Sequence, residues 1–241
     1  NDNNINLKVH ISTQASTLNY EAVSFWKSQG VERVVLAREM SKNEIKEIID
    51  KTGMEIETFV HGAMCSSYSG RCVLSNYFTK RDANRGGCAQ ICRWEFPLYD
   101  KNNNMIESET KFTASSKDLM MLTKVKEMIE IGIVSLKVEG RMRSNYYVAT
   151  VINTYRNLID DYYENKLTEE KVEYYQKILD RVANREATVQ FWDKLPTVNE
   201  QYYLGRNEVS NQDFLGIVKD YDETTSMVTI TERNYFQTGD E

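Results

Sequence analysis

Short apolar runs alternate with amphipathic helical stretches through the first two thirds of this 241-residue chain. Strands are predicted over residues 5–11, 33–37, 55–60, 111–114 and 133–138, and helices over residues 20–29, from the N-cap Ser41 onward, and over residues 117–131 and 145–163. Alternation of this kind builds a parallel sheet, as a doubly wound sheet or a β/α barrel. Five such units are fewer than a closed barrel needs, so any barrel formed here is partial.

The last third of the chain has a different pattern of predicted secondary structure. A second, acidic helix is predicted over residues 168–184, followed by short β runs over residues 202–204, 214–220 and 227–231. We therefore expect an α/β fold: a partial β/α (TIM-like) barrel with a cysteine-rich insertion, followed by the start of a small β-barrel domain. Three parts are expected: residues 1–165 as the partial barrel with a metal-binding segment at 57–96, residues 166–199 as a helical linker, and residues 200–241 as the beginning of the β-barrel. The chain opens without a methionine, and both ends are expected to be truncated.

Charge and hydropathy narrow the class of partner. The net charge of −6 argues against a protein that coats nucleic acid indiscriminately, and we expect no DNA partner. No apolar run is long enough to cross a bilayer, so no membrane partner is expected. The stretch from residue 71 to residue 93 has a positive net charge, because its only acidic residue is Asp82. Its five basic residues are Arg71, Lys80, Arg81, Arg85 and Arg93. A solvated loop would explain it, and so would a rim that receives an anionic substrate or an RNA backbone.

The four cysteines of the chain lie in one short window with the spacing C-x6-C-x15-C-x3-C: Cys65, Cys72, Cys88 and Cys92. Thiolates gathered in this way are typical of a metal site. Zinc sites usually use closer cysteine pairs at both ends, whereas iron–sulfur clusters accept looser spacing. A disulfide pair is the third alternative, although a chain of this length should bury a core without covalent cross-links. All three alternatives remain open on spacing alone.

Polar residues follow the predicted strands at the points where they end. In parallel α/β folds, ligands bind at the carboxyl ends of strands, so these residues predict a pocket. They are Ser12, Thr13 and Gln14, then Arg38 and Glu39, then His61, then Ser115 and Ser116, then Lys137, Glu139 and Arg141. Glu57 lies inside a strand, where its carboxylate needs a partner such as Arg38 or a lysine. A structural ion pair and a catalytic acid or base explain Glu57 equally well.

Residues 57–75, with the sequence ETFVHGAMCSSYSGRCVLS, resemble the signature of the collagenase-like peptidases of unassigned catalytic type, family thirty-two of that class. Further likenesses cover residues 12–14 (STQ), 33–39 (RVVLARE), 81–86 (RDANRG), 88–94 (CAQICRW), 116–119 (SKDL) and 136–141 (LKVEGR). The resemblance extends over about residues 5–165. It implies a β/α barrel with about three more units before Asn1, and an appended small β-barrel.

Members of that family divide by activity: some were named as proteases that act on collagen, and others hydroxylate RNA bases or quinone precursors without molecular oxygen. The likeness is greatest to the branch that hydroxylates uridine at the wobble position of transfer RNA and draws on prephenate. It implies that Cys65, Cys72, Cys88 and Cys92 hold a [4Fe-4S] cluster, with zinc as the alternative. Transfer RNA, a paralogous family subunit and a cytoplasmic location are the expectations that follow.

Three functions are therefore weighed. The first is iron–sulfur-dependent wobble-uridine hydroxylation, with an interleaved set of aromatic and basic residues in the cysteine window stacking an unpaired base. The second is a collagenase-like endopeptidase, for which the chain offers only two histidines and neither an H-E-x-x-H nor a G-x-S-x-G motif. The third is a zinc-stabilised RNA-binding subunit without activity. The catalytic candidates are Glu57, His61 and Glu139, and the substrate-binding candidates are Gln14, Arg38, Arg71, Arg85, Lys137 and Arg141.

Overall fold

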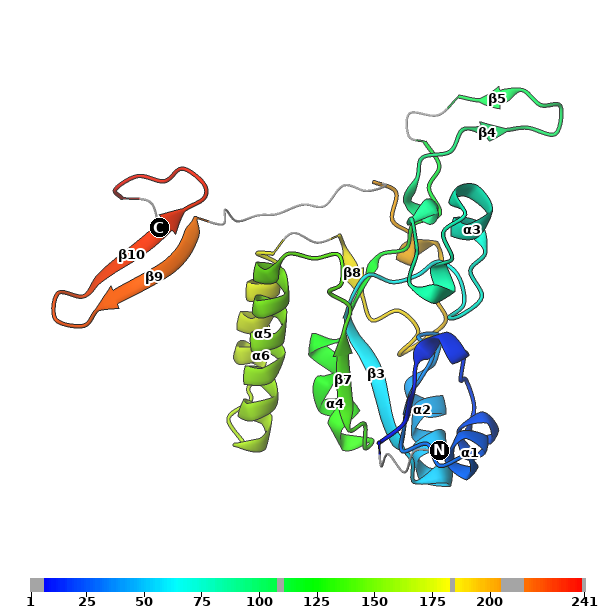
Figure 1. Cartoon of the computed structure of the whole chain (residues 1–241), viewed down its shortest axis with the longest axis horizontal. Coiled ribbons are helices and arrows are strands. Elements are labelled where there is room, and N and C mark those ends of the chain that lie inside the picture. Colours follow the sequence, from blue (N-terminus) through cyan, green and yellow to red (C-terminus); the bar gives the residue numbers. More distant parts are fainter. Residues whose placement is uncertain (1–6, 108–110, 183–184, 205–214, 240–241) are drawn as a thin grey trace.

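A computed structural model describes residues 7–107, 111–182, 185–204 and 215–239. It is a mixed α/β structure around a mainly parallel central sheet (Figure 1). The strands of this sheet are β1 (His10–Ile11), β2 (Arg33–Val35), β3 (Glu55–Gly62), β6 (Asp118–Met120), β7 (Ser135–Val138) and β8 (Ala187–Thr188). The α-helices are α1 (Tyr20–Ser28), α2 (Lys42–Thr52), α3 (Leu74–Thr79), α4 (Val125–Glu130), α5 (Asn145–Tyr163) and α6 (Glu169–Leu179).

The sheet is centred on β3. Five of its strands follow the order β1-β2-β3-β6-β8, and the sixth, β7, pairs with β3. The pairings of β3 with β2 and β7 are parallel, and β6 is antiparallel, through His61 opposite Met120 and Gly62 opposite Leu119. This sheet is open among the described residues and does not confirm a TIM barrel, which stays a prediction.

The register divides the sheet into an apolar and a polar face. Val34, Ile56 and Val60 are fully buried and belong to the main hydrophobic core, into which the helices also send their apolar side chains. On the opposite face, Glu57 and Phe59 alternate with these residues and stay half-buried. The polar face carries the charged candidates described below.

Local signals place the helices. Ser41 caps α2 in a capping box with Glu44, and Gly53 ends it with φ of +57°. Asn19, Ser144 and Thr168 cap α1, α5 and α6 through their side chains. The helices predicted at residues 20–29 and 145–163, and the one that starts at Ser41, are therefore confirmed.

Three predicted elements are wrong. Residues 111–114 form no strand; only Phe112 makes an isolated bridge, to Phe96. The helix predicted over residues 117–131 is replaced in its first part by β6, because residues 118–120 pair with β3 and β8, and α4 begins only at Val125. No strand covers residues 202–204; Gln201 instead bridges Ser116. Five residues of predicted elements lie outside the described residues: Ile5, Asn6, Ala183, Asn184 and Phe214.

Residues 63–117 leave the sheet after β3 and return to it at β6, and we call them the cysteine segment. It contains α3, three-residue 3-10 turns at Ala83–Arg85 and Ile91–Arg93, and a projecting hairpin of β4 (Leu98–Tyr99) and β5 (Met105–Ile106) (Figure 1). Further along the chain, β9 (Gly216–Asp222) and β10 (Met227–Glu232) pair only with each other within the described residues. The division of the chain into three domains stays a prediction. No helix of the described residues is both long and apolar enough to span a membrane.

Candidate metal and RNA-base site

The cysteine segment rests on the carboxyl ends of the parallel strands. Gly70 adopts φ of +76° and lies so close to Gln14, which follows β1, that a Cβ at Gly70 would collide with the Gln14 carbonyl oxygen. Glu39, which follows β2, accepts hydrogen bonds at Oε1 from the backbone N–H (2.9 Å) and the hydroxyl (3.1 Å) of Ser69. The structure therefore brings Gln14 and the cysteine segment together at the edge where the sequence predicted a pocket.

The cysteine segment also meets the sheet at a second place, the end of β7, which we call the junction. Gly62 adopts φ of +109° at the end of β3, where a Cβ would collide with the carbonyl oxygen of Glu139. The Arg141 side chain approaches the cysteine segment: its Nη1 lies 3.0 Å from the position that a Cβ on Gly86 would occupy. The Glu139 carboxylate accepts a hydrogen bond from the Arg141 backbone N–H (3.1 Å). Glu139 and Arg141 thus lie at the boundary between the sheet and the cysteine segment.

All four cysteines are free thiols; Cys65, Cys72 and Cys92 are half-buried and Cys88 is exposed. Burial raises the pKa of the Cys65 thiol, and the nearby Cys92 and Cys72 raise it further, while Arg38 lowers it. These influences place three of the thiols and Arg38 in one electrostatic neighbourhood. Hydrogen bonds also hold two of the cysteines: the Cys92 carbonyl accepts from Thr113 Oγ1 (3.1 Å), and Cys88 Sγ accepts from the Gln90 N–H (3.3 Å).

The donor chemistry fits a metal–thiolate centre, because four unpaired thiols lie on one segment beside basic side chains. Within the described residues, however, no group of three or more histidine, cysteine, aspartate or glutamate side chains is drawn together as around a metal ion. The fit is therefore one of donor type and neighbourhood.

The polar face of the sheet carries a second charged group. Glu57 accepts a hydrogen bond from Ser135 Oγ (2.8 Å) and pairs with Lys137 Nζ at 3.4 Å and Arg33 Nη1 at 3.7 Å. The expected lysine partner of Glu57 is thus Lys137. Arg38 lies over the Phe59 ring, 4.5 Å from its centroid, and Lys137 approaches the same ring at 5.5 Å. Two cations therefore meet at Phe59, and the Nε of Arg38 is buried with no hydrogen-bond partner among the described residues.

The cysteine segment exposes several aromatic and basic side chains. The Phe78 ring lies 5.2 Å from Tyr77, 6.4 Å from Trp94 and 6.3 Å from Phe96, between ring centroids. Tyr77 is 81% exposed and Phe78 52% exposed. Four exposed basic residues of the segment form no ion pair with any residue that the structure describes: Arg71, Lys80, Arg81 and Arg85. We call these aromatic and basic residues the outer surface.

Beside this junction lies an open cavity of about 660 Å³, next to the N-terminus of α5. Three arginines line it, Arg141, Arg143 and Arg156, together with Asn145 and Asn153. None of the described residues that line it is acidic. Two of these arginines are ion-paired outside the lining, Arg143 with Asp118 and Arg156 with Asp160.

His61 lies away from the outer surface. It is 3% exposed and packs between β3 and α5, with ring centroids 5.8 Å from Tyr147 and 5.7 Å from Tyr155. Burial, followed by the nearby Arg143, lowers the pKa of His61 to about 4. Its Nδ1 lies 3.4 Å from the Tyr155 hydroxyl, which itself donates to the Val60 carbonyl (2.9 Å). His61 is therefore a neutral base in the core.

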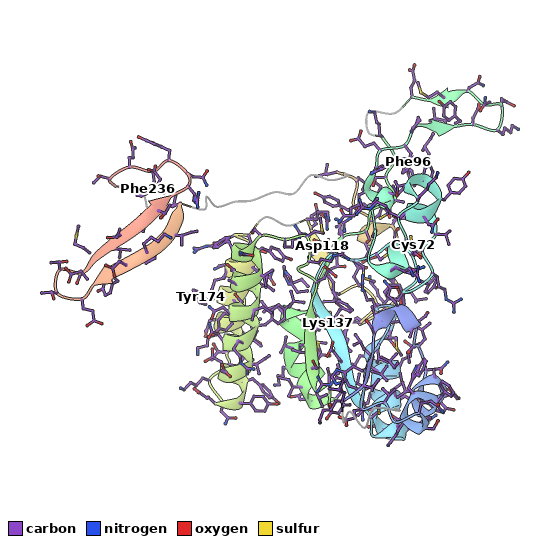
Figure 2. All side chains as sticks on the ribbon, viewed as in Figure 1. Cys72, Phe96, Asp118, Lys137, Tyr174 and Phe236 are labelled. Atoms are coloured by element: carbon purple, nitrogen blue, oxygen red, sulfur yellow. The ribbon has the colours of Figure 1, made fainter. Side chains whose placement is uncertain are left out.

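One charged cluster was missed by sequence reasoning. Asp118 at the start of β6 is 3% exposed and accepts from Arg143 and Arg185, at the end of the sheet from which the cysteine segment extends (Figure 2). Arg143 follows the strand predicted over residues 133–138 by five residues, and Arg185 lies outside any predicted strand end, so neither gave a signal in the sequence.

Comparison with known proteins gives two results. The sequence model of peptidase family U32 matches residues 1–202. "tRNA hydroxylation protein P1" of Bacillus subtilis is 48% identical over 98% of this chain and 57% of its own length. "tRNA hydroxylation protein P" of Escherichia coli is 31% identical over 97% of this chain and 61% of its length. "Collagenase" of Porphyromonas gingivalis is 35% identical over 85% of this chain and 49% of its length.

The chain therefore spans about half to three fifths of the length of these relatives. No solved structure matches the chain significantly.

Proposed function

The chain belongs to peptidase family U32, and from this premise we propose that it takes part in hydroxylating the wobble uridine of transfer RNA, with an iron–sulfur centre and without molecular oxygen. The observation that carries the proposal is the position of the cysteine segment. This one segment carries four free thiols and exposed aromatic and basic side chains, and it contacts the strand ends at Gln14 and Arg141. That combination provides a redox-capable donor set next to a surface suited to RNA.

Cys65, Cys72, Cys88 and Cys92 are the residues that would hold a [4Fe-4S] centre, with zinc as the alternative metal. When bound, such a centre supplies electron transfer at the mouth of the sheet. The segment that carries these cysteines is fixed against the strand ends by two contacts, that of Gly70 with Gln14 and that of Ser69 with Glu39. The Cys92 backbone is held from the core side by Thr113, which is fully buried.

The outer surface is the proposed RNA contact. Arg71, Lys80, Arg81 and Arg85 are free of ion pairs within the described chain, so their charges remain available to phosphates. Tyr77 and Phe78 expose ring faces on which an unpaired base can stack. A wobble base belongs to a single-stranded loop, which is the form of RNA that stacking recognises.

The polar face of the sheet is the proposed site for an anionic co-substrate, for which the family resemblance suggests prephenate. Arg38 and Lys137 present two cations beside Phe59. Arg141 adds a third positive charge at the junction with the cysteine segment. Glu57 is held between Lys137 and Ser135 and would accept or return a proton there, while Glu139 is placed to do so nearer the thiols.

The remaining parts of the proposal follow the same premise. We propose that the open sheet is part of a TIM-like barrel, that β9 and β10 begin a small β-barrel, and that a paralogous subunit and the cytoplasm are its partner and location.

For peptidase activity the geometry gives little support. Neither His10 nor His61 hydrogen-bonds to a serine or cysteine of the described chain, and His61 is a weak base in the core.

The proposal predicts that Cys88→Ala removes hydroxylated wobble uridine from the transfer RNA of cells in which this gene is the only source of the activity. The change removes one of four thiol ligands from an exposed position, so the fold should tolerate it. Mass spectrometry of digested transfer RNA measures the result, and Ser66→Ala beside Cys65 is the matched control.

Undiminished hydroxyuridine in the Cys88→Ala strain would contradict the proposal. Anaerobic metal analysis of the wild-type chain separates the alternatives: iron with labile sulfide supports the hydroxylase, and a single zinc supports a non-enzymatic RNA-binding subunit. Gelatin cleavage by the metal-free chain would support the collagenase-like endopeptidase.

A further inference from the structure

Arg38 follows β2 on the polar face of the sheet, and its charged group has no polar partner among the described residues. Only its backbone N–H is bonded, and it donates to Ser69 Oγ (3.4 Å). The guanidinium lies instead on the Phe59 ring of β3, with Cζ 4.5 Å from the ring centroid. The residue is half-buried, and a charge that loses part of its hydration normally gains a partner in return.

The three nitrogens of this guanidinium have different surroundings. Nε is buried and has no hydrogen-bond partner among the described residues. The two Nη groups also form no described hydrogen bond, but they are not buried in this way, so both keep contact with solvent. A guanidinium with Nε turned inward presents its two Nη groups as a fork, which matches the two oxygens of one carboxylate.

The ring of Phe59 restricts the directions in which this fork can point. Phe59 alternates along β3 with residues that face the core, and its half-buried side chain also packs against the core. A planar guanidinium stacks on an aromatic face and is attracted to it. A free arginine side chain loses rotamer entropy when it binds a ligand, and the contact with Phe59 has removed part of that freedom beforehand.

Lys137 approaches the same ring, but its charge already has a partner. Its Nζ lies 5.5 Å from the ring centroid and 3.4 Å from Oε1 of Glu57. Arg38 is therefore the cation at Phe59 that forms no ion pair within the described part of the chain. One unpaired guanidinium suits a carboxylate, with a single negative charge, better than a phosphate monoester, which carries nearly two at neutral pH.

We infer that Phe59 is a positioning residue of the co-substrate site: its ring holds the Arg38 guanidinium as a preorganised fork for one carboxylate of that molecule. The inference rests on the proposed function, because it requires a small anionic co-substrate on the polar face of the sheet. Phe59 acts through Arg38. A lysine at position 38 keeps the charge but not the fork, so charge alone does not restore binding.

The test is calorimetric titration of prephenate into the whole metal-free chain, as wild type and as variants. Phe59→Leu removes the ring and should weaken binding about fivefold. Phe59→Tyr keeps the ring and should bind as wild type does. Arg38→Lys should weaken binding about tenfold. The double variant should bind no more weakly than Arg38→Lys alone, because the ring has no effect once the fork is lost.

Two matched controls make the same substitutions elsewhere. Phe25→Leu changes a ring on α1 that is 54% exposed, and Arg156→Lys changes an arginine on α5 that pairs with Asp160. Both variants should keep the wild-type affinity. If Phe59→Leu does not fold, Phe59→Met carries the same comparison.

Wild-type affinity in Phe59→Leu or in Arg38→Lys would overturn the inference alone. Additive losses in the double variant, or a loss in Phe59→Tyr equal to that in Phe59→Leu, would also overturn it, because the ring would then not act through the fork. A wild-type chain that does not bind prephenate would overturn the co-substrate part of the proposed function together with the inference.

Discussion

At the scale of single residues, the two histidines of the chain occupy opposite environments. His61 is enclosed by Tyr147 and Tyr155, whereas His10 is exposed in β1. A neutral imidazole in the core must gain a proton when the chain unfolds at mildly acid pH. The stability of this protein should therefore depend on His61 in a way that it does not depend on His10.

The sign of this dependence follows from the lowered pKa of His61, about 4 against an ordinary value of 6.5. Between these values only the unfolded chain binds the proton, so stability is complete above pH 6.5 and falls as the pH drops toward 4. The loss at pH 4 is about 3 kcal/mol. Urea unfolding of wild type and His61→Asn at several pH values measures it as a difference between their pH profiles.

His10→Asn is the control and should keep the wild-type profile. Equal profiles for wild type and His61→Asn would show that the histidine is protonated or exposed in the folded protein.

Residue-level prediction succeeded where chemistry demanded a partner. Glu57 was expected to need a cation because it lies inside a strand, and Lys137 provides it. Arg38, the other candidate, packs on Phe59 instead, which sequence could not reveal because the choice depends on neighbouring strands. Whether Glu57, His61 or Glu139 acts in catalysis stays a prediction.

At the scale of elements, local sequence signals specify some helices, whereas tertiary strand pairing specifies β6. Ser41 with Glu44 and the cap Ser144 specify their helices within a few residues, so α2 and α5 were predicted. Residues 118–120 have an apolar pattern that also suits a helix, and their pairing with β3 and β8 decides otherwise. The position of Asp118 in the sheet, and with it the arginine cluster, was therefore beyond sequence reasoning.

The seating of the cysteine segment on the strands can be tested at Gly70. Gly70→Ala adds a Cβ that would collide with the Gln14 carbonyl, in a backbone conformation that alanine rarely adopts. The segment should lift from the strand end and expose Cys65, whose thiol is half-buried. Alkylation of Cys65, followed by mass spectrometry, should become several-fold faster.

Gly53→Ala is the matched control, because Gly53 also has a positive φ of +57° but no atom lies within 4 Å of an added Cβ. It should cost stability of α2 without changing the alkylation of Cys65. Equal rates in wild type and Gly70→Ala would show that the segment does not depend on this contact.

At the scale of the whole molecule, the Asp118 cluster joins parts that are far apart in the sequence. Asp118 belongs to β6, Arg143 lies just before α5 and Arg185 just before β8. Asp118 accepts hydrogen bonds from both arginines. Its removal should weaken both connections at once.

Asp118→Asn should accordingly lower the free energy of unfolding by about 3–5 kcal/mol, because it removes the buried negative charge that pairs with Arg143 and Arg185. Urea unfolding of the metal-free chain, followed by circular dichroism, measures the change. Asp160→Asn breaks only the exposed pair with Arg156 and should change stability by less than about 1 kcal/mol. A small effect of Asp118→Asn would mean that water already screens the cluster.

The cysteine segment leaves the sheet at Gly62 and returns opposite it at Leu119, so its two ends are adjacent partners in β3 and β6. Because its two ends are held next to each other, the cysteine segment can change in length or in sequence while β3 and β6 keep their register.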